Sequence, residues 1–251
     1  MNPIEQLVLF FVSLVSNTFS AFSGGGAGLI QFPVLIFLGL SFGVALATHK
    51  VASVALGVGA ALRYLSSSKL ERRFVFLMVL FGLPGVVLGG NIILQVPDRI
   101  AEIALGVLTG GLGLYSIFKA TLGQEYKPKN RDRNGLLFGG LALFFLGILN
   151  GSLTSGTGLF VTIWLVLWFG MDYQRAVAYT LTMVGLFWNG AGALTLGILG
   201  DIYWQWLPAL LLGSLLGGYL GSHLAIKHGN RWIKRLFEVV TILISIKLLF
   251  G

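Results

Sequence analysis

The sequence has no cysteine among its 251 residues and only three histidines. Without thiols, the chain offers no disulfides, no thiolate metal ligands and no thiol–disulfide chemistry. The histidines do not occur in the H-E-x-x-H pattern of a metal enzyme, and no nucleophile lies at helical spacing from a base. We therefore expect no enzyme activity, no cofactor and no metal site.

Charged residues are also scarce, at 10% of the chain, whereas hydrophobic residues make up 56% and the mean hydropathy is +0.88. Apolar runs recur from end to end, which is typical of an all-α polytopic membrane protein in a lipid bilayer. The net charge of +8 lies in a few loops between these runs, where it is a topology signal. We therefore expect no nucleic-acid partner.

Two short polar breaks interrupt the apolar runs at corresponding positions, Ser23–Gly28 and Ser152–Gly158. The runs after them, 29–40 and 159–170, cover only about 18 Å as helices and cannot cross a hydrocarbon core of about 30 Å. Irregular backbone at membrane depth is tolerated only where it is buried in protein or lines a polar cavity. Paired breaks of this kind predict the binding site of a transporter.

The chain divides into two halves that repeat one plan, 1–118 and 135–251, joined by a basic linker over 119–134. A constant offset superposes Gly39 on Gly170 and Gly82 on Gly213. We therefore predict two repeats, each with one broken helix pair and three full spans. The expected apolar elements are 4–22, 29–40, 43–64, 74–94 and 100–118 in the first half, and 136–150, 159–170, 172–196, 203–222 and 232–250 in the second.

Basic loops predict that the two repeats are inverted. The loops 65–73 and 223–235 and the linker are rich in Lys and Arg, which indicates the cytoplasmic side, whereas 197–202 carries only Asp201. Both termini are then outside, and each broken pair is re-entrant, entering from opposite faces. The run 4–22 is long enough to cross, and we expect it to tilt or to begin in the interface. The N-terminus lacks the features of a signal peptide, so we expect mature sequence there.

The stretch GGGAGLIQFP at 24–33, together with ALAT at 45–48, resembles the sulfite exporter TauE/SafE family. The resemblance covers both halves, although only Gly156 and Gly158 of the glycine motif remain in the second half and Ile163 replaces the proline. It implies export of small sulfur-containing anions, such as sulfite or organosulfonates, across a bacterial-type inner membrane. The sequence leaves open whether the chain forms a homo-oligomer.

The candidate site combines the two breaks with an intramembrane cation. Helix N-termini at the breaks attract anions through free N–H groups and partial positive charge, and Lys50 inside a span is a functional hypothesis by default. The expected residues are Ser23, Gly24, Gly25, Gly26, Gly28, His49, Lys50, Asn150, Ser152, Thr154, Ser155, Gly156, Thr157, Gly158, Thr180, Trp188 and Asn189.

The same residues also allow purely structural interpretations. The glycines could serve helix packing alone, and Lys50 could extend to the interface while His49 makes a structural hydrogen bond. Glu238, in the last span, is expected to pair with Lys234 one turn earlier. Besides an alternating-access transporter, the sequence fits an anion channel or facilitator, an uptake permease, or a non-transporting scaffold subunit.

Overall fold

The computed structural model describes residues 3–66, 70–92, 98–152 and 157–250, and these ranges are helical apart from short connections. The first half contains α1 (Pro3–Ser23), η1 (Ala27–Leu29), α2 (Gln31–Phe37), α3 (Phe42–Leu65), α4 (Arg72–Ile92) and α5 (Asp98–Phe118). The second half contains α6 (Arg133–Ser152), α7 (Thr157–Phe169), α8 (Tyr173–Tyr179), η3 (Thr180–Trp188), α9 (Asn189–Leu199), η4 (Trp204–Trp206), α10 (Leu207–His228) and α11 (Asn230–Phe250).

Within the described ranges, six helices are long and apolar enough to cross a membrane: α1, α3, α4, α6, the continuous segment Tyr173–Leu199, and Trp204–His228. Large hydrophobic side chains stand exposed around them, among them Phe37, Ile198 and Phe118 at 83–89% exposure. An apolar surface of this extent indicates contact with lipid. The chain is a multi-pass membrane protein.

This set of spans differs from the expected one. It includes α1 and α6, which we expected as arms of the broken pairs, and it does not include α5 and α11. The helix α6 is longer than the predicted run 136–150 because Arg133, Asn134 and Gly135 begin it and Gly151 and Ser152 continue it. At 20 residues, α6 extends about 30 Å, the thickness of a hydrocarbon core.

The predicted short helix 29–40 is replaced by a 3-10 turn, η1, and the seven-residue helix α2. Three consecutive glycines before it, Gly24, Gly25 and Gly26, have φ angles of 91°, 148° and 100°. Side chains rarely adopt such angles, so the glycines permit the sharp change of direction after α1. Gly39, with φ 102°, separates α2 from α3.

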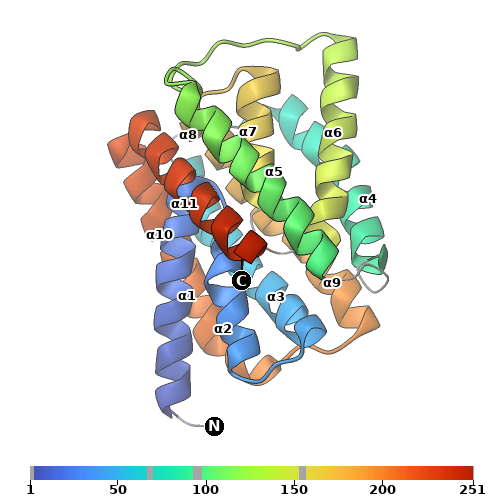
Figure 1. The fold of residues 1–251 in the computed structure, drawn as a ribbon, viewed down its shortest axis with the longest axis vertical. Coiled ribbons are helices and arrows are strands. Elements are labelled where there is room, and N and C mark those ends of the chain that lie inside the picture. Colours follow the sequence, from blue (N-terminus) through green and yellow to red (C-terminus); the bar gives the residue numbers. More distant parts are fainter. Residues whose placement is uncertain (1–2, 67–69, 93–97, 153–156, 251) are drawn as a thin grey trace.

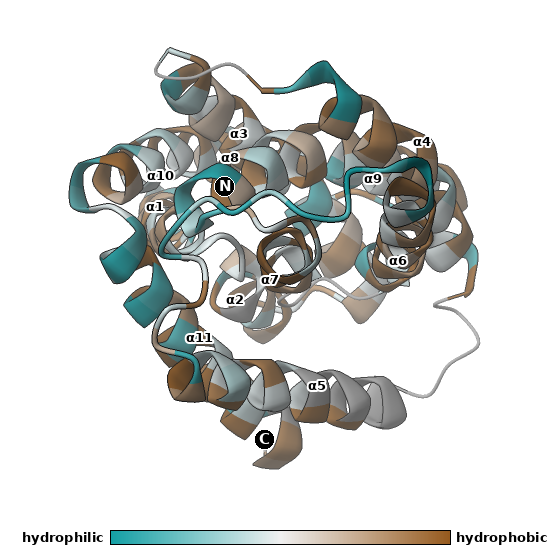
Figure 2. Cartoon of the chain, turned by 90° about the horizontal axis from the view of Figure 1, so that it is seen from above, coloured by the Kyte–Doolittle hydropathy of each residue, from teal (hydrophilic) through white to brown (hydrophobic). Residues whose placement is uncertain are grey.

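The helices pair reciprocally between the two halves. The first helix of each half packs against the other half, α1 on α10 and α6 on α4. The helices α3 and η3 pack together, as do α5 and α11. Figure 2 shows α5 and α11 side by side along one edge, with α7 near the middle of the bundle. In Figure 1, α1 starts at the end of the molecule that holds the N-terminus, and α6 starts at the opposite end.

Glycines bring the paired backbones close together. A Cβ atom at Gly217 on α10 would lie 2.6 Å from the Leu14 carbonyl oxygen on α1. On the other pair, Gly85 and Gly89 of α4 face the α6 backbone at Phe144 and Ile148. Larger residues would force these helices apart, which is the small-residue packing that the glycine content predicts.

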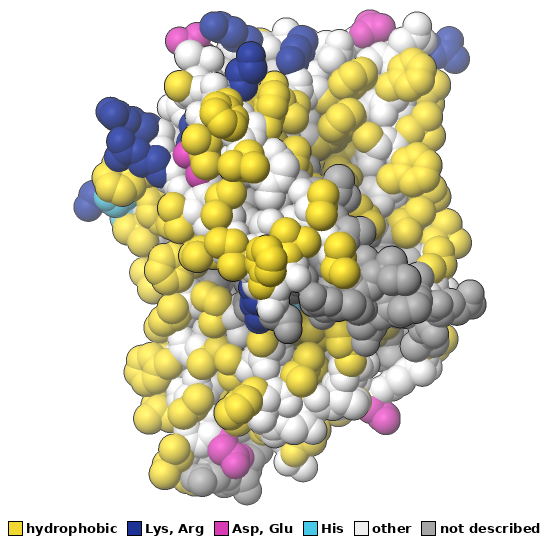
Figure 3. All heavy atoms as spheres, viewed as in Figure 1, with side chains coloured by type: hydrophobic (Ala, Val, Ile, Leu, Met, Phe, Trp, Pro, Cys, Tyr) yellow, Lys and Arg dark blue, Asp and Glu magenta, His cyan; other side chains and the backbone are white. Residues whose placement is uncertain are grey.

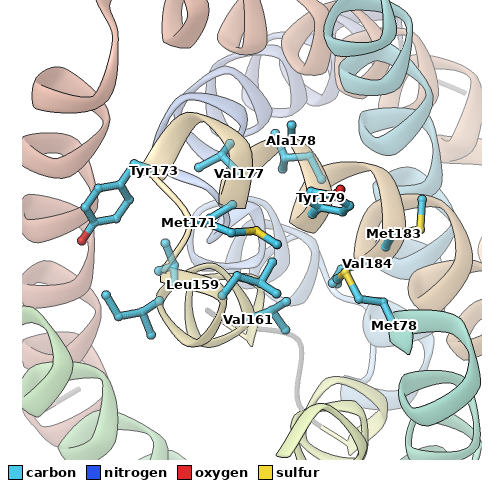
Figure 4. Packing of buried hydrophobic residues seen from close by; sticks show 14 of the residues in the cluster. Met78, Leu159, Val161, Met171, Tyr173, Val177, Ala178, Tyr179, Met183 and Val184 are labelled. Atoms are coloured by element: carbon cyan, nitrogen blue, oxygen red, sulfur yellow. The ribbon is translucent and has the colours of Figure 1, made fainter. Parts of the chain in front are cut away.

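The core surrounds α7, which is apolar all round and largely buried. Figure 4 shows Leu159 and Val161 of α7 facing Val177 and Val184 across the core, with Met78 of α4 alongside. Because α7 begins at Thr157, this packing buries the C-terminal end of the second break inside the protein.

Charge is distributed unevenly along the long axis. Lys and Arg side chains gather toward the end that carries the α5–α6 linker (Figure 3). There Arg131 forms an ion pair with Glu71 at 3.0 Å, and its guanidinium lies 4.7 Å from the centre of the Phe74 ring. These contacts tie the linker to the start of α4.

Candidate functional site

The two breaks meet inside the protein. The backbone at Gly25 is so close to the second break that a Cβ there would lie 2.7 Å from the Leu159 nitrogen. Thr162, one turn into α7, donates a hydrogen bond of 2.8 Å to the Gly24 carbonyl oxygen. Side chains larger than hydrogen at Gly25 would therefore separate the two halves.

A small polar cavity of about 40 Å³ lies at this meeting point. By this measure a water molecule needs about 10–15 Å³, so the cavity holds on the order of three waters or one compact polar group. Its lining residues are Ser20, Gly25, Gly26, Ala27, Gly28, His49, Lys50, Ser53, Leu56, Asn150, Thr157, Gly158, Thr180, Leu181, Val184, Gly185 and Asn189.

Lys50 brings a cation to the cavity from α3, with only 1% of its surface exposed. Its ammonium donates to the backbone carbonyl of Asn150, to Asn150 Oδ1 at 3.0 Å and to Asn189 Oδ1 at 3.3 Å. All three acceptors are neutral. Among the residues that the structure describes, no carboxylate forms an ion pair with Lys50. An uncompensated buried charge is costly, and a negative charge in the cavity would offset this cost.

The two asparagines reach the ammonium from different elements. Asn150 lies near the end of α6, and its Nδ2 donates to Thr157 Oγ1 at 2.9 Å. This bond joins the end of α6 to the start of α7 across the second break. Asn189 follows the π-helical segment η3. The site therefore depends on how α3, α6 and α9 pack.

His49 lies beside Lys50 and is held by a polar network that extends away from the cavity. Its Nδ1 is 2.9 Å from Gln31 Oε1, and Gln31 Nε2 donates to Ser13 Oγ at 3.1 Å. Because the Gln31 amide donates to Ser13, its oxygen is left to accept the Nδ1 proton. His49 Nε2 then carries the lone pair, 3.3 Å from the Ser53 hydroxyl.

A further part of the cavity wall comes from η3, a π-helix in the middle of the long segment Tyr173–Leu199. Its residues Thr180, Leu181, Val184 and Gly185 line the cavity. Gly185 lies against α3, where a Cβ at Gly57 would be 2.6 Å from the Leu186 nitrogen. π-helical turns inside α-helices are frequent at functional sites because they re-aim side chains and free backbone groups.

The structure brings ten of the expected site residues to the cavity: Gly25, Gly26, Gly28, His49, Lys50, Asn150, Thr157, Gly158, Thr180 and Asn189. Thr154, Ser155 and Gly156 lie outside the described residues.

Four expected residues lie elsewhere. Ser23 donates to the Phe19 carbonyl at 2.9 Å and Ser152 to the Ile148 carbonyl at 2.9 Å. Both hydroxyls therefore bond to the backbone in the last turn of their own helices. Gly24 is packed against Thr162. Trp188, expected as a cavity wall, donates from its indole to the Met78 carbonyl at 2.9 Å and fills the space beside Gly82 of α4.

Of the two short helices after the breaks, α7 brings its N-terminus to the cavity and α2 does not. The helix α7 has 13 residues and begins at Thr157 in the cavity wall. In contrast, α2 has seven residues and begins at Gln31, beyond the break. The N–H groups of Gly24 and Gly25 both donate to the Ser20 carbonyl, at 2.9 and 2.8 Å. They extend the end of α1 and are therefore not available to an anion.

Two hydroxyl residues in the cavity wall, Ser20 and Ser53, were missed by the sequence analysis. Ser53 lies one helical turn after His49 on the same helix face, so its spacing from His49 indicates it. Ser20 lies in the last turn of α1, before the glycine break, and its sequence context gives no comparable signal.

Comparison with known proteins identifies the chain. The family model described as "Sulfite exporter TauE/SafE" matches residues 9–248. The chain belongs to the TauE/SafE family. It is 28% identical over 97% of its length, and 94% of the relative, to a probable membrane transporter protein of Haemophilus influenzae. It is 27% identical over 100% of its length, and 91% of the relative, to the probable membrane transporter protein YfcA of Escherichia coli K12.

A more distant relative is the probable membrane transporter protein YtnM of Bacillus subtilis, at 23% identity over 89% of this chain and 76% of the relative. No solved structure matches the chain. The family match and the six apolar spans together describe a membrane transporter.

Proposed function

We propose that the protein exports small sulfur-containing anions, such as sulfite or organosulfonates, and binds them at the cavity beside Lys50. One observation carries the proposal: a buried ammonium, 1% exposed, whose hydrogen-bond acceptors are neutral oxygens of Asn150 and Asn189. An anion in the cavity supplies the missing countercharge. Outward direction rests on the family description alone.

The size and polarity of the cavity support a compact anionic group. A volume of about 40 Å³ suits a sulfite or sulfonate head better than a large polar solute. Thr157 and Thr180 offer hydroxyl groups in the wall, and the N-terminus of α7 adds partial positive charge. Ser20 and Ser53 add further hydroxyl groups to the wall.

The proposed mechanism is alternating access between two inverted repeats, 1–118 and 135–251, with 119–134 as a cytoplasmic linker. The reciprocal pairs α1–α10 and α6–α4 support this arrangement, as does the start of α1 and α6 from opposite ends of the molecule (Figure 1). In this proposal 4–40 and 136–170 are the broken pairs whose tips meet at Gly25 and Gly158. Rocking one repeat against the other would expose the site to each side in turn.

The proposed location is the inner membrane, with both termini outside. The gathering of Lys and Arg at the linker end (Figure 3) supports a cytoplasmic position for that end. The exposed apolar surface is compatible with a homo-oligomer. A mass measurement of the purified protein in detergent would establish the oligomeric state.

The proposal is tested first by anion binding. Purified protein is heated with sulfite, thiosulfate, methanesulfonate, sulfate or chloride, and its unfolding is followed. At a hundredfold excess over the dissociation constant, a bound anion stabilises the fold by about 2.7 kcal/mol. We expect a selective response to a sulfur anion in the wild type and in Lys227→Met, an exposed lysine on α10. Lys50→Met should abolish it. An equal response to every salt, or an unchanged response in Lys50→Met, would refute the site.

Transport is tested in proteoliposomes loaded with the anion that binds. A transporter working by alternating access shows faster uptake of labelled anion when unlabelled anion is present on the opposite side. A channel of the same architecture shows no such trans-stimulation. Efflux from right-side-out membrane vesicles then tests export, and uptake without efflux would favour a permease.

A further inference from the structure

The linker between the two halves is fastened to both of them. Its backbone bonds to the second half, where the Lys127 N–H donates to the Gly170 carbonyl oxygen at 2.9 Å. Its side chains bond to the first half at Glu71, which directly precedes α4. The Arg131 guanidinium donates to both carboxylate oxygens of Glu71, at 3.0 and 3.3 Å, and the Tyr126 hydroxyl donates to one of them at 3.2 Å. The linker therefore holds the start of α4 against the second half.

Three buried aromatic rings adjoin this ion pair. The Phe74 ring on α4 lies 4.9 Å from the Phe169 ring and 5.9 Å from the Tyr179 ring, measured between centroids. The Tyr179 hydroxyl accepts a hydrogen bond from the Glu71 N–H, and the Arg131 guanidinium covers the Phe74 ring. Because Phe74 belongs to the first half and the other two rings to the second, these rings close the boundary between the halves at the linker end.

A recess of about 60 Å³ lies beside the ion pair, and its walls include Glu71, Tyr126, Arg175, Ala178 and Tyr179. The next two residues along the chain, Thr180 and Leu181, line the polar cavity that holds Lys50. One short helical stretch, 178–181, therefore borders the recess on the linker side and the polar cavity inside the protein.

The contact between Arg131 and Glu71 is suited to repeated opening. Their side chains are 24% and 48% exposed, and ion pairs at exposed positions contribute little to stability. Breaking such a pair changes the population of the closed arrangement only a few-fold, so the closed and open arrangements can interconvert.

We propose that Glu71, Arg131 and Tyr126 form a latch that keeps the linker end of the protein closed over the polar cavity. Release of Glu71 lets the start of α4 move away from Tyr179, which parts the three aromatic rings and joins the recess to the cavity. This inference rests on the proposed function, because a transporter that works by alternating access needs a closed side with contacts that can be broken.

The absence of cysteine from the chain allows a test with one reporter thiol. Leu181→Cys places the thiol in the cavity wall, at a position that is 3% exposed. Membrane vesicles of both orientations are treated with sulfonatoethyl methanethiosulfonate, a small anionic thiol reagent that does not cross membranes. Glu125→Cys, at an exposed linker position, is prepared separately and identifies the vesicles whose linker side faces the reagent. The labelling rate of Leu181→Cys from that side measures how often the gate is open.

The latch is weakened by Glu71→Gln, which keeps the shape of the side chain and removes its charge. We expect labelling of Leu181→Cys from the linker side to rise about fivefold, equivalent to about 1 kcal/mol, and to stay unchanged from the opposite side. Glu71→Arg repels Arg131 and should raise the rate further. Adding Arg131→Glu to Glu71→Arg restores an ion pair, and the rate should return toward that of the unmodified latch.

Glu125→Gln is the matched control. It also removes a carboxylate of this region, but Glu125 pairs with Lys127 inside the linker, at 2.8 Å, and does not bridge the halves. Its labelling rate should equal that of Leu181→Cys alone. An equal rise in this control, or a rise from both sides of the membrane, would mean that loss of charge loosens the whole bundle, and the latch would be refuted. An unchanged rate in both Glu71 variants would refute it as well.

Protection by methanesulfonate tests the proposed function separately. In the Glu71→Gln variant, methanesulfonate should slow the labelling, and adding Lys50→Met should remove this protection. If labelling responds to Glu71 but not to methanesulfonate, the latch stands and the anion site is refuted. If methanesulfonate protects in a Lys50-dependent way but the Glu71 variants label like the unmodified latch, the anion site stands and the latch is refuted.

Discussion

Among the lysines that the structure describes, Lys50 and Lys234 are buried, and they differ in what neutralises them. Lys234 on α11 forms an ion pair with Glu238 one turn later and also donates to the Ser116 carbonyl of α5. Lys50 on α3 is more deeply buried, at 1% exposure against 7%, yet its acceptors are amide and backbone oxygens. The pairing of Lys234 with Glu238 confirms what their spacing predicts.

The difference separates a structural lysine from a candidate binding lysine. The Lys234–Glu238 pair is complete and joins α11 to α5, with Ser116 donating to the Glu238 carboxylate at 2.9 Å. The charge of Lys50 has hydrogen bonds but no countercharge within the described chain. Burial of a lysine therefore does not by itself indicate an anion site. The acceptors around its ammonium show whether a countercharge is missing.

The largest expected effect comes from breaking the complete pair. Lys234→Met leaves the partly buried Glu238 carboxylate without its countercharge, and loss of one partner of a buried pair costs up to about 3–5 kcal/mol. Denaturant unfolding should show this loss. Adding Glu238→Gln in the same chain should recover most of the stability. If Lys234→Met alone is as stable as the wild type, the pair is not a structural element.

A smaller loss of stability is expected from Ser116→Ala. This change removes a hydrogen bond to the charged Glu238 carboxylate, and such bonds contribute about 1.5–3 kcal/mol. The melting temperature should fall while the stabilisation by added anion stays as in the wild type. A change in the anion response would contradict the separation between the α5–α11 pair and the cavity.

The comparison is sharpened by giving Lys50 a carboxylate of its own. In Asn189→Asp, a carboxylate oxygen replaces the Oδ1 that lies 3.3 Å from the ammonium, so the charge is neutralised within the chain. We expect anion binding to weaken about tenfold or more, which is about 1.4 kcal/mol. Asn189→Leu is the control, because it removes the acceptor without adding charge. Equal binding in both variants would show that countercharge does not govern the site.

The smallest expected change is in the stability of Lys50→Met without ligand. The variant loses hydrogen bonds to Asn150 and Asn189 but also removes a buried charge, and replacing buried charges by apolar groups is often neutral or stabilising. Its free energy of unfolding should stay within about 1 kcal/mol of the wild type. A loss as large as that of Lys234→Met would show that Lys50, like Lys234, stabilises the fold through its own contacts.

Much of this organisation follows from local sequence. The apolar runs predict most helices. The glycines at 24–26 predict the first break, and in the structure they have positive φ angles that other residues rarely adopt. The helix α6 extends beyond the predicted run 136–150, since Arg133, Asn134 and Ser152 are polar but remain helical. The helix α2 was overestimated, because an apolar run does not distinguish a helix from a 3-10 turn.

The site was predicted less completely. Lys50 and His49 stand out because ionisable residues are rare inside apolar spans. Trp188 was expected near the cavity from its neighbour Asn189, but adjacent residues on a helix point about 100° apart, and its ring turns toward Met78. Ser53 went unnoticed because a serine in a membrane helix is common and carries no signal by itself.

The sequence by itself determined that this chain is a helical membrane protein with two breaks and a cation in its third helix, because hydropathy and glycine content act over short stretches. Only the tertiary structure decided what surrounds that cation. Asn150 and Asn189 lie 100 and 139 residues from Lys50 along the chain, and they converge on one ammonium because α3, α6 and α9 pack together.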